Sequence, residues 1–396
     1  MNKKTIKDID VYDKKVLVRV DFNVPVIDGV ITDDNRVVEA LPTIKYLLEK
    51  GAAVILMSHL GRPEGKPTKK YSLAVVAKRL KELLPDNKVV MAKDVIGEDA
   101  KTKAKELKMG EVLLLENLRF DAREEENDKE FCKELASMAE VYVNDAFGTA
   151  HRKHASTYGV AKLRPNAIGF LIEKELQLIC GAIETPKRPF VGILGGAKVK
   201  DKIGIIDSLL NTVDTLIIGG GMAYTFLHAK GYKIGNSLFD ESNVETAKAL
   251  MKKAEEKGVN FMLPVDFVET PNFDDVVNYR YTKDENISDG YEGVDIGKKT
   301  IKLFSKAIKK AKTVIWNGPV GVFEKKEFAV GTYAIAKKLT KVKGTTIIGG
   351  GDSASAVINM GLAKKMTHIS TGGGASLKLF EGKVLPGVDV VDNKEM

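Results

Sequence analysis

Short, continuous apolar runs alternate with segments of helical periodicity along almost the whole chain, and this alternation limits the folds that it can adopt. The runs lie at 16–20, 53–57, 88–91, 112–115 and 141–143 in the first half and at 190–194, 215–218, 260–263, 313–316, 345–348 and 367–370 in the second. A strand that is apolar at every position, rather than at alternate positions, is covered on both faces, as in parallel sheets. The sequence therefore predicts an α/β fold.

The segments between these runs have the pattern of crossover helices. In residues 72–84, the side chains of Leu73, Val76, Leu80 and Leu84 repeat at the spacing of one helix face. Helices that connect parallel strands pack on the two faces of the sheet. We therefore expect two doubly wound, Rossmann-like parallel-sheet domains with a cleft between them.

A helical segment that ends at Thr185-Pro186 separates the two sets of apolar runs. This segment predicts a first domain at 1–170, an interdomain helix and hinge at 171–186, a second domain at 187–377 and a C-terminal tail at 378–396. The last residues show no periodic pattern, so we expect the tail to be extended and to pack back toward the N-terminal domain.

Composition argues against several other classes of protein. The 396 residues are 44% hydrophobic and 29% charged, which is typical of a globular protein of two or three domains. No apolar run reaches the roughly 18 to 20 residues of a membrane span, and the N-terminus lacks a signal peptide's apolar core, so a cytoplasmic protein is expected. Cys132 and Cys180 stand singly, which indicates neither a disulfide framework nor a zinc site.

Polar and basic residues directly follow the predicted strands of the first half. They are Asp21, Asn23, His59, Arg62, Arg119, His151 and Arg152, with Arg36 near the first loop. Ligands of open α/β sheets bind beyond the carboxyl ends of the strands, and a guanidinium can bind two phosphate or carboxylate oxygens at once. Each arginine alone could equally form a surface salt bridge. Their shared position at strand ends predicts an anion-binding site.

Glycines occupy the corresponding positions in the second half. The segments LGGAKVKDK, GGGM, GGGDS and TGGGAS follow four of its predicted strands. Glycine lets backbone N–H groups approach an anion closely, and the following helix directs the positive end of its dipole toward that anion. A single cluster could serve a tight turn alone, but four at one sheet edge favour a nucleotide site. None reads GxGxxG, which argues against NAD.

Three charged residues suit this predicted nucleotide site. Asp352 could hold Mg²⁺ through one carboxylate oxygen, although it could also serve only as a helix cap. Lys198 and Lys202 could reach phosphate oxygens as point charges. Magnesium bound together with ATP or ADP is therefore the cofactor that we expect.

Eight segments resemble motifs of the phosphoglycerate kinase family, in the family's order. They are DFNVP, SHLGRP, ENLRF, VNDAFGTAHR, LGGAKVKDKI, WNGPVGVFE, GGGDSA and STGGGAS, and they span essentially the whole chain. The resemblance implies a monomeric glycolytic enzyme that reversibly transfers a phosphoryl group from 1,3-bisphosphoglycerate to MgADP, giving 3-phosphoglycerate and MgATP.

The resemblance also implies roles for individual residues. The phosphoglycerate would be bound by Asp21, Asn23, Arg36, His59, Arg62, Arg119 and Arg152. The nucleotide would be bound by Lys202, Gly293, Glu324, Gly350, Gly351, Asp352 and Ser353, with Glu324 at the ribose and Asp352 at the magnesium. The transferring group would be neutralised by Arg36, Lys198 and the loop amides of Gly372 and Gly373.

Such a reaction needs no general base, because the attacking oxygen is already ionised at neutral pH. Alignment and charge neutralisation by arginine, lysine, magnesium and backbone amides would then carry the catalysis. Two sites on two domains would also have to close together, so we expect hinges near 170–186 and 377–382.

Two departures from the family pattern are Lys378, where an acidic residue is usual, and Lys298, where proline is usual.

The sequence leaves two other functions open. A kinase for another small carboxylic acid would share the nucleotide site but would need a different acid-binding site. A nucleic-acid-binding protein could use the net charge of +8, but basic residues are interspersed with acidic ones and no run of stacking aromatics accompanies them.

Overall fold

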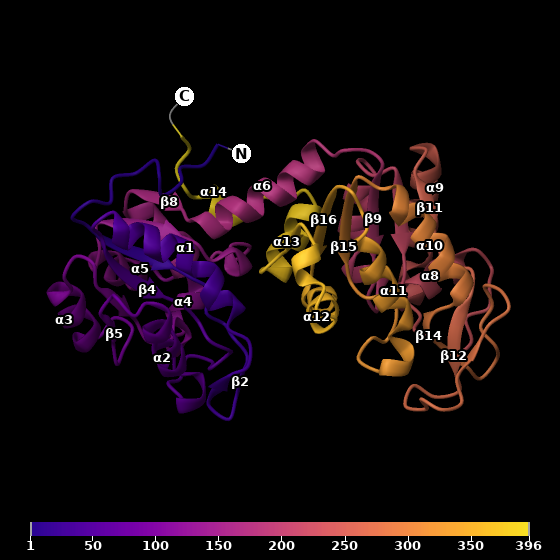
Figure 1. Ribbon diagram of the computed structural model, residues 1–396, viewed down its shortest axis with the longest axis horizontal. Coiled ribbons are helices and arrows are strands. Elements are labelled where there is room, and N and C mark those ends of the chain that lie inside the picture. Colours follow the sequence, from indigo (N-terminus) through magenta and orange to yellow (C-terminus); the bar gives the residue numbers. More distant parts are fainter. Residues whose placement is uncertain (1, 395–396) are drawn as a thin grey trace. The chain divides into compact units, whose positions relative to one another are not determined.

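The computed structural model describes residues 2–394, and its chain forms two compact units. The N-terminal unit contains the residues up to Gln177 together with the segment from Val384 onward. The C-terminal unit is Leu178–Lys383. Each unit contains one six-stranded sheet, which can be followed in Figure 1.

The sheet of the N-terminal unit is entirely parallel. Its strands are β1 (Lys15–Arg19), β4 (Ala53–Met57), β5 (Val89–Met91), β6 (Val112–Leu114), β7 (Val141–Asn144) and β8 (Asn166–Ile168). Their order across the sheet is β5-β6-β4-β1-β7-β8, and all five pairs are parallel. Strand β8 was not predicted, because three residues are too short to give a periodic signal. The predicted parallel-sheet fold is confirmed.

Helices cover both faces of this sheet because successive strand residues point to opposite sides. Val16 and Val18 of β1 pack into one hydrophobic cluster with residues of α1 and α2, whereas Leu17 packs into another with residues of α3 and α5. The helices of this unit are α1 (Asn35–Glu49), α2 (Ala74–Leu83), α3 (Glu98–Glu106), α4 (Arg123–Glu126), α5 (Lys129–Ser137) and α14 (Pro386–Asp389).

The C-terminal unit repeats this architecture with the strand order of a classical dinucleotide-binding fold. Its parallel sheet has the order β11-β10-β9-β15-β16-β17, the doubly wound 3-2-1-4-5-6 pattern. The strands are β9 (Phe190–Leu194), β10 (Thr215–Ile218), β11 (Asn260–Met262), β15 (Thr313–Asn317), β16 (Thr345–Gly349) and β17 (His368–Ile369). The order reverses between β9 and β15, which is where such sheets bind ligands.

A small antiparallel sheet in this unit was not predicted from the sequence. It consists of β12 (Phe267–Thr270), β13 (Arg280–Tyr281) and β14 (Glu292–Ile296), in the order β13-β12-β14. The helices of the unit are α7 (Ile203–Leu209), α8 (Met222–Ala229), α9 (Val244–Glu256), α10 (Lys298–Lys310), α11 (Val330–Leu339), α12 (Gly351–Asn359) and α13 (Gly373–Phe380). Helix α6 (Phe170–Glu184) begins in the N-terminal unit and ends in the C-terminal one.

The final segment contains a short helix instead of being wholly extended. Helix α14 begins at Pro386, a residue whose fixed φ suits the first helical position. The Asn144 side chain donates a hydrogen bond to the Gly387 carbonyl (2.8 Å), which ties α14 to the end of β7 within the N-terminal unit.

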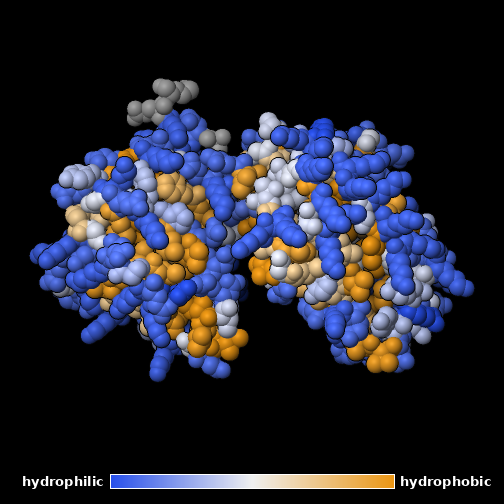
Figure 2. Space-filling view, viewed as in Figure 1, coloured by the Kyte–Doolittle hydropathy of each residue, from blue (hydrophilic) through white to orange (hydrophobic). Residues whose placement is uncertain are grey.

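The surface is mostly hydrophilic on the face that Figure 2 shows. An exception is the hairpin of β2 (Val26–Ile27) and β3 (Val30–Ile31), where Ile27 is 62% and Val30 is 64% exposed. No helix within residues 2–394 has the length and apolar composition needed to cross a membrane.

Asp145 accepts hydrogen bonds from the first turn of α6, and its titration is expected to make the stability of the protein depend on pH. Its Oδ1 accepts the backbone N–H groups of Leu171 (2.9 Å) and Ile172 (3.2 Å), and complete burial raises the pKa of its carboxyl from 3.8 to about 7. Between these two values the folded protein binds more protons than the unfolded chain, so the Asp145 contribution to stability falls as pH rises.

We therefore expect wild type to lose stability relative to Asp145→Asn between about pH 4 and pH 7, by at most about 1.4 kcal/mol per pH unit. Urea unfolding of both proteins across this range measures the difference. Asparagine keeps the Oδ1 acceptor, so parallel pH profiles would show that Asp145 is ionised throughout.

Candidate functional site

Basic side chains gather beyond the carboxyl ends of four neighbouring strands, β6, β4, β1 and β7. We call the group the basic cluster, and its members are Arg19, Arg36, His59, Arg119 and Arg152. Arg19 ends β1, His59 follows β4, and Arg36 lies in the first turn of α1. Arg119 lies in the 3-10 helix Leu118–Phe120 after β6, and Arg152 follows β7. Because parallel strands end at the same sheet edge, side chains distant in the sequence come together there.

His59 lies buried among the arginines. It is 4% exposed, and Arg19 Nη2 lies 3.2 Å from its Nδ1. The pKa of His59 is held well below 6.5, first by burial and then by the positive charges of Arg19, Arg119, Arg36 and Arg152. The imidazole is therefore neutral at physiological pH, and the site's positive charge resides on guanidinium groups.

Short hydrogen bonds fix the loops that carry these residues. Arg36 Nη1 donates to Asp21 Oδ2 (2.8 Å), and Asn23 Oδ1 accepts the backbone N–H of Gly61 (2.8 Å). Arg119 Nη1 donates to the carbonyl of the same Gly61 (3.0 Å). The loops after β1, β4 and β6 thus hold each other in place.

Arg119 retains unused hydrogen-bonding capacity. Its side chain is 5% exposed, and its Nε lies 3.2 Å from Glu125 Oε1. Its buried Nη2 has no hydrogen-bond partner among residues 2–394. A buried guanidinium nitrogen without an acceptor is costly, and an anionic oxygen at this position would satisfy it.

The predicted arginines of the first half differ in their burial and in their electrostatic effect on His59. Arg152 is half-buried, and its Nε lies 3.2 Å from His151 Nε2. Arg62 is exposed in the loop after β4 and is absent from the charges that act most strongly on His59. The structure brings Arg36, Arg119 and Arg152 within electrostatic reach of His59, and it leaves Arg62 at the periphery.

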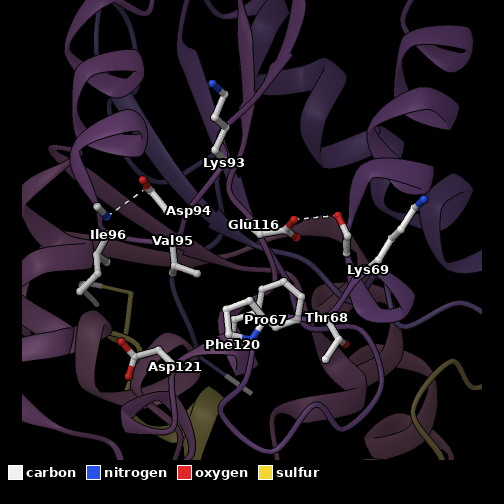
Figure 3. A pocket seen from close by; sticks show the side chains of 12 residues that line it. Pro67, Thr68, Lys69, Lys93, Asp94, Val95, Ile96, Glu116, Phe120 and Asp121 are labelled. Carbon is white, nitrogen blue, oxygen red and sulfur yellow. Dashed lines mark hydrogen bonds between the residues drawn. The ribbon is translucent and has the colours of Figure 1, made fainter.

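A pocket of about 510 Å³ lies at the same sheet edge, beside the outermost strand β5 and its neighbour β6 (Figure 3). The carboxylates of this pocket already accept hydrogen bonds from neighbouring residues. Glu116 accepts the Ser72 hydroxyl (2.7 Å), and Asp94 accepts the Gly97 N–H (3.0 Å). The pocket is lined by none of the predicted site residues, so it is not the main candidate for the site.

Sequence reasoning missed two charged residues, Arg19 of the basic cluster and Glu124 behind it. Arg19 is 1% exposed and Glu124 is completely buried. Arg19 sits inside the apolar run VLVRV, and a charge within such a run is a signal that could have identified it. Glu124 lies in a run of acidic residues, EEE, which gives no signal of burial.

In the C-terminal unit, glycines allow three strand-end loops to interlock. The backbone N–H of Gly195 after β9 donates to the Asn317 carbonyl (2.9 Å), and that of Gly220 after β10 donates to the Val320 carbonyl (3.1 Å). Gly318 after β15 has a φ of +93°, and a Cβ there would overlap the carbonyl of Gly195. The bare backbone is therefore required by the packing of these loops on one another.

Two polar side chains lie at the end of β15. Lys202 Nζ donates a hydrogen bond to Asn317 Oδ1, and burial lowers the pKa of Lys202, opposed by Asp201 and then Asp352. Asn317 is 1% exposed, and its Nδ2 has no hydrogen-bond partner among residues 2–394. Gly350, with a φ of +88°, leaves room beside this amide, since a Cβ would lie 2.8 Å from Nδ2. Asn317 was not predicted, although it stands in the quoted segment WNGPVGVFE.

Two helices begin at the neighbouring glycine loops. Helix α12 starts at Gly351, with exposed Asp352 in its first turn, and Ser353 Oγ accepts the Gly318 N–H (2.6 Å). Helix α13 starts at Gly373, where a Cβ would lie 3.5 Å from the Cα of Gly350. The two positive helix ends therefore lie side by side.

Three predicted residues lie apart from these helix starts. Lys198 is exposed just before the 3-10 helix Val199–Asp201. Gly293 is in β14, where its N–H donates to Ser237 Oγ (2.9 Å). Glu324 is exposed in the loop that follows β15, and that loop reaches β14 through the Val322 N–H and the Val294 carbonyl (2.8 Å). A single loop thus runs from the end of β15 to the side of β14.

Known proteins similar to this chain share one description. The family model described as "Phosphoglycerate kinase" matches residues 6–383. Proteins of that name from Clostridium botulinum strain Hall and strain Alaska E43 are 58% and 59% identical, with 99% of each chain covered. Among solved structures, that of phosphoglycerate kinase from Coxiella burnetii has a TM-score of 0.88 at 38% identity, and that from Pyrococcus horikoshii has 0.80 at 35%; each covers 98% of both chains.

Proposed function

The chain belongs to the phosphoglycerate kinase family, and from that premise we propose how its own residues carry out the reaction. The reaction is the glycolytic transfer of a phosphoryl group between 1,3-bisphosphoglycerate and ADP, so the chain is an enzyme, a kinase. The resemblance noted in the sequence is confirmed.

The basic cluster is the single observation that carries the proposal for the acid substrate. Four arginines act on a neutral His59, and a buried nitrogen of Arg119 lacks an acceptor among the described residues. A substrate with both a phosphate and a carboxylate matches several guanidinium groups better than a neutral acid does. We assign 3-phosphoglycerate to this cluster, with Asp21 and Asn23 holding its loops and Arg62 at its rim.

The glycine loops of the C-terminal unit support a nucleotide site. Backbone N–H groups and two adjacent helix N-termini suit the phosphates of ATP or ADP. Lys202 and the loop from Gly350 to Ser353 would bind these phosphates. Gly293 in β14 and Glu324 in the loop that leads to β14 would meet the nucleoside, with Glu324 at the ribose.

Magnesium fits at Asp352 as an ion shared with the nucleotide. Residues 2–394 contain no group of three or more His, Cys, Asp or Glu side chains that could hold a metal, so most ligands would come from phosphate oxygens and water. The exposed Asp352 carboxylate at the start of α12 would supply one oxygen. When bound, the ion neutralises phosphate charge.

Catalysis would rest on charge neutralisation rather than on a base. The attacking oxygen belongs to an ionised carboxylate or phosphate, so no proton needs to be removed. Arg36 and Lys198 would neutralise the transferring phosphoryl group, assisted by the backbone amides of Gly372 and Gly373.

The two sites are on different units, so we infer that the units close over the substrates, with hinges near 170–186 and 377–382. We also infer a cytoplasmic monomer.

A crossed pair of variants tests the assignment of the two substrates. Arg119→Ala removes guanidinium contacts and should weaken 3-phosphoglycerate binding about tenfold to a hundredfold, because hydrogen bonds to charged groups carry about 1.5–3 kcal/mol. MgATP binding should be unchanged. Asp352→Ala should weaken binding of MgADP but change binding of magnesium-free ADP little. Calorimetric titration of each variant with each ligand measures both effects.

The matched controls are Arg123→Ala, an exposed arginine paired with Asp121, and Asp274→Ala, an exposed carboxylate paired with Lys325. Neither control should alter either affinity. Loss of both ligands in the Arg119 variant, or of neither, would contradict the assignment of the acid substrate to the basic cluster.

A further inference from the structure

A buried chain of hydrogen bonds runs from His59 and Arg19 of the basic cluster to Glu124. Glu124 Oε1 accepts the Ser156 hydroxyl (2.5 Å), and Oε2 accepts the Ser156 backbone N–H (3.0 Å). The same hydroxyl oxygen accepts Arg19 Nε (2.8 Å), and Arg19 Nη2 lies 3.2 Å from His59 Nδ1. Glu124 and Ser156 are completely buried and Arg19 is 1% exposed, so water does not compete for these contacts.

The direction of each hydrogen bond follows from the chemistry of the groups. Arginine carries only donors, so Arg19 Nε–H must donate to the Ser156 oxygen, and the serine proton is then directed to Glu124. For the same reason His59 Nδ1 must be the acceptor of Arg19 Nη2. A neutral imidazole with an unprotonated Nδ1 carries its proton on Nε2. His59 therefore presents Nε2–H as a donor.

Glu124 is suited to hold this arrangement through its two acceptor oxygens. Burial raises the pKa of the Glu124 carboxyl, and the charge of Arg19 is the first of the effects that oppose this rise, followed by the hydrogen bonds from Ser156. Both of its oxygens accept hydrogen bonds from Ser156, which a glutamine could not match with its single acceptor oxygen. Its negative charge is the first of those that oppose the desolvation of Arg19. The Tyr142 hydroxyl also donates to the Ser156 carbonyl (2.7 Å), which fixes the serine backbone.

We propose that Glu124 is a positioning residue for the acid substrate: through Ser156 and Arg19 it fixes His59 as the Nε2–H tautomer, so that His59 donates a hydrogen bond to an anionic oxygen. This inference rests on the proposed assignment of 3-phosphoglycerate to the basic cluster. Glu124 itself lies behind Arg19 and does not contact the substrate.

Imidazole ¹⁵N NMR tests the proposal without relying on activity. Among five histidines, the His59 signals are identified by their loss in His59→Gln. In wild type we expect a pyridine-type shift for Nδ1 and a pyrrole-type shift for Nε2. In Glu124→Gln both shifts should move toward a mixture of tautomers, and the KM for 3-phosphoglycerate should rise about tenfold to a hundredfold. The KM for MgATP should stay within about twofold.

Two further variants keep the test decisive. Glu126→Gln, an exposed acid of the same helix α4, is the matched control and should change neither the shifts nor either KM. Ser156→Ala breaks the same chain of hydrogen bonds and replaces Glu124→Gln if that variant does not fold. Unchanged His59 shifts in a folded Glu124→Gln or Ser156→Ala protein, or an equal rise of both KM values, would overturn the proposal.

The failure of this proposal can be told apart from failure of the proposed substrate site. If 3-phosphoglycerate moves the His59 signals of wild type but Glu124→Gln leaves them at their wild-type positions, only the role of Glu124 is wrong. If 3-phosphoglycerate leaves the wild-type signals unmoved, the assignment of the substrate to the basic cluster is wrong, and the role of Glu124 toward that substrate falls with it.

Discussion

Replacing Arg36 with alanine is expected to lower kcat by about 10³- to 10⁵-fold, the range found for arginines that neutralise a transferring phosphoryl group. Arg36 lies in the first turn of α1 and is held by Asp21 at 2.8 Å, so its guanidinium is fixed before substrate arrives. A preformed charge contributes most in the transition state, so KM for 3-phosphoglycerate should change much less than kcat.

The measurement is a coupled assay with 3-phosphoglycerate, MgATP, glyceraldehyde-3-phosphate dehydrogenase and NADH. Arg123→Ala, an exposed arginine of the same unit, should retain wild-type turnover. A variant at Arg36 that raised KM but kept kcat would show that this arginine only binds the substrate. Unfolding midpoints of both variants show whether the loss arises from the site or from the fold.

Replacing Gly318 with alanine is expected to destabilise the protein by about 2–5 kcal/mol and to weaken MgADP binding about tenfold or more. Two costs add at this position. The φ of +93° costs an L-residue about 1–2 kcal/mol, and the new Cβ would overlap the Gly195 carbonyl, so that backbone must shift. The Gly318 N–H also donates to Ser353 Oγ, so the shift would displace the loop from Gly350 to Ser353 that we assign to the phosphates.

Gly361→Ala separates these two costs. Gly361 has a φ of +67°, but a Cβ there meets nothing within 4 Å, so this variant carries only the backbone cost of about 1–2 kcal/mol. Urea unfolding gives the two stabilities, and titration with MgADP gives the affinities. Equal destabilisation in both variants would mean that the loops can separate without cost and that their close packing does not determine the nucleotide site.

The alternation of apolar runs and helical segments was enough to predict the parallel sheets. That pattern is local, because a strand buried on both faces must be apolar at every position. The antiparallel sheet of β12, β13 and β14 was missed for a related reason. Its strand β13 has only two residues, both exposed, and carries no continuous apolar signal.

The sequence by itself also identified which residue types follow each strand. It thus predicted arginines at the strand ends of the first sheet and glycines at the strand ends of the second. Only the tertiary structure decided how these residues meet. Strand order brings β6, β4, β1 and β7 side by side, and no single strand contains that information. Glu124 is the clearest case. It stands in a charged segment that a sequence would leave in solvent, yet it is completely buried, where the charge of Arg19 and the hydrogen bonds from Ser156, both far from it in the chain, oppose the rise in its pKa that burial causes.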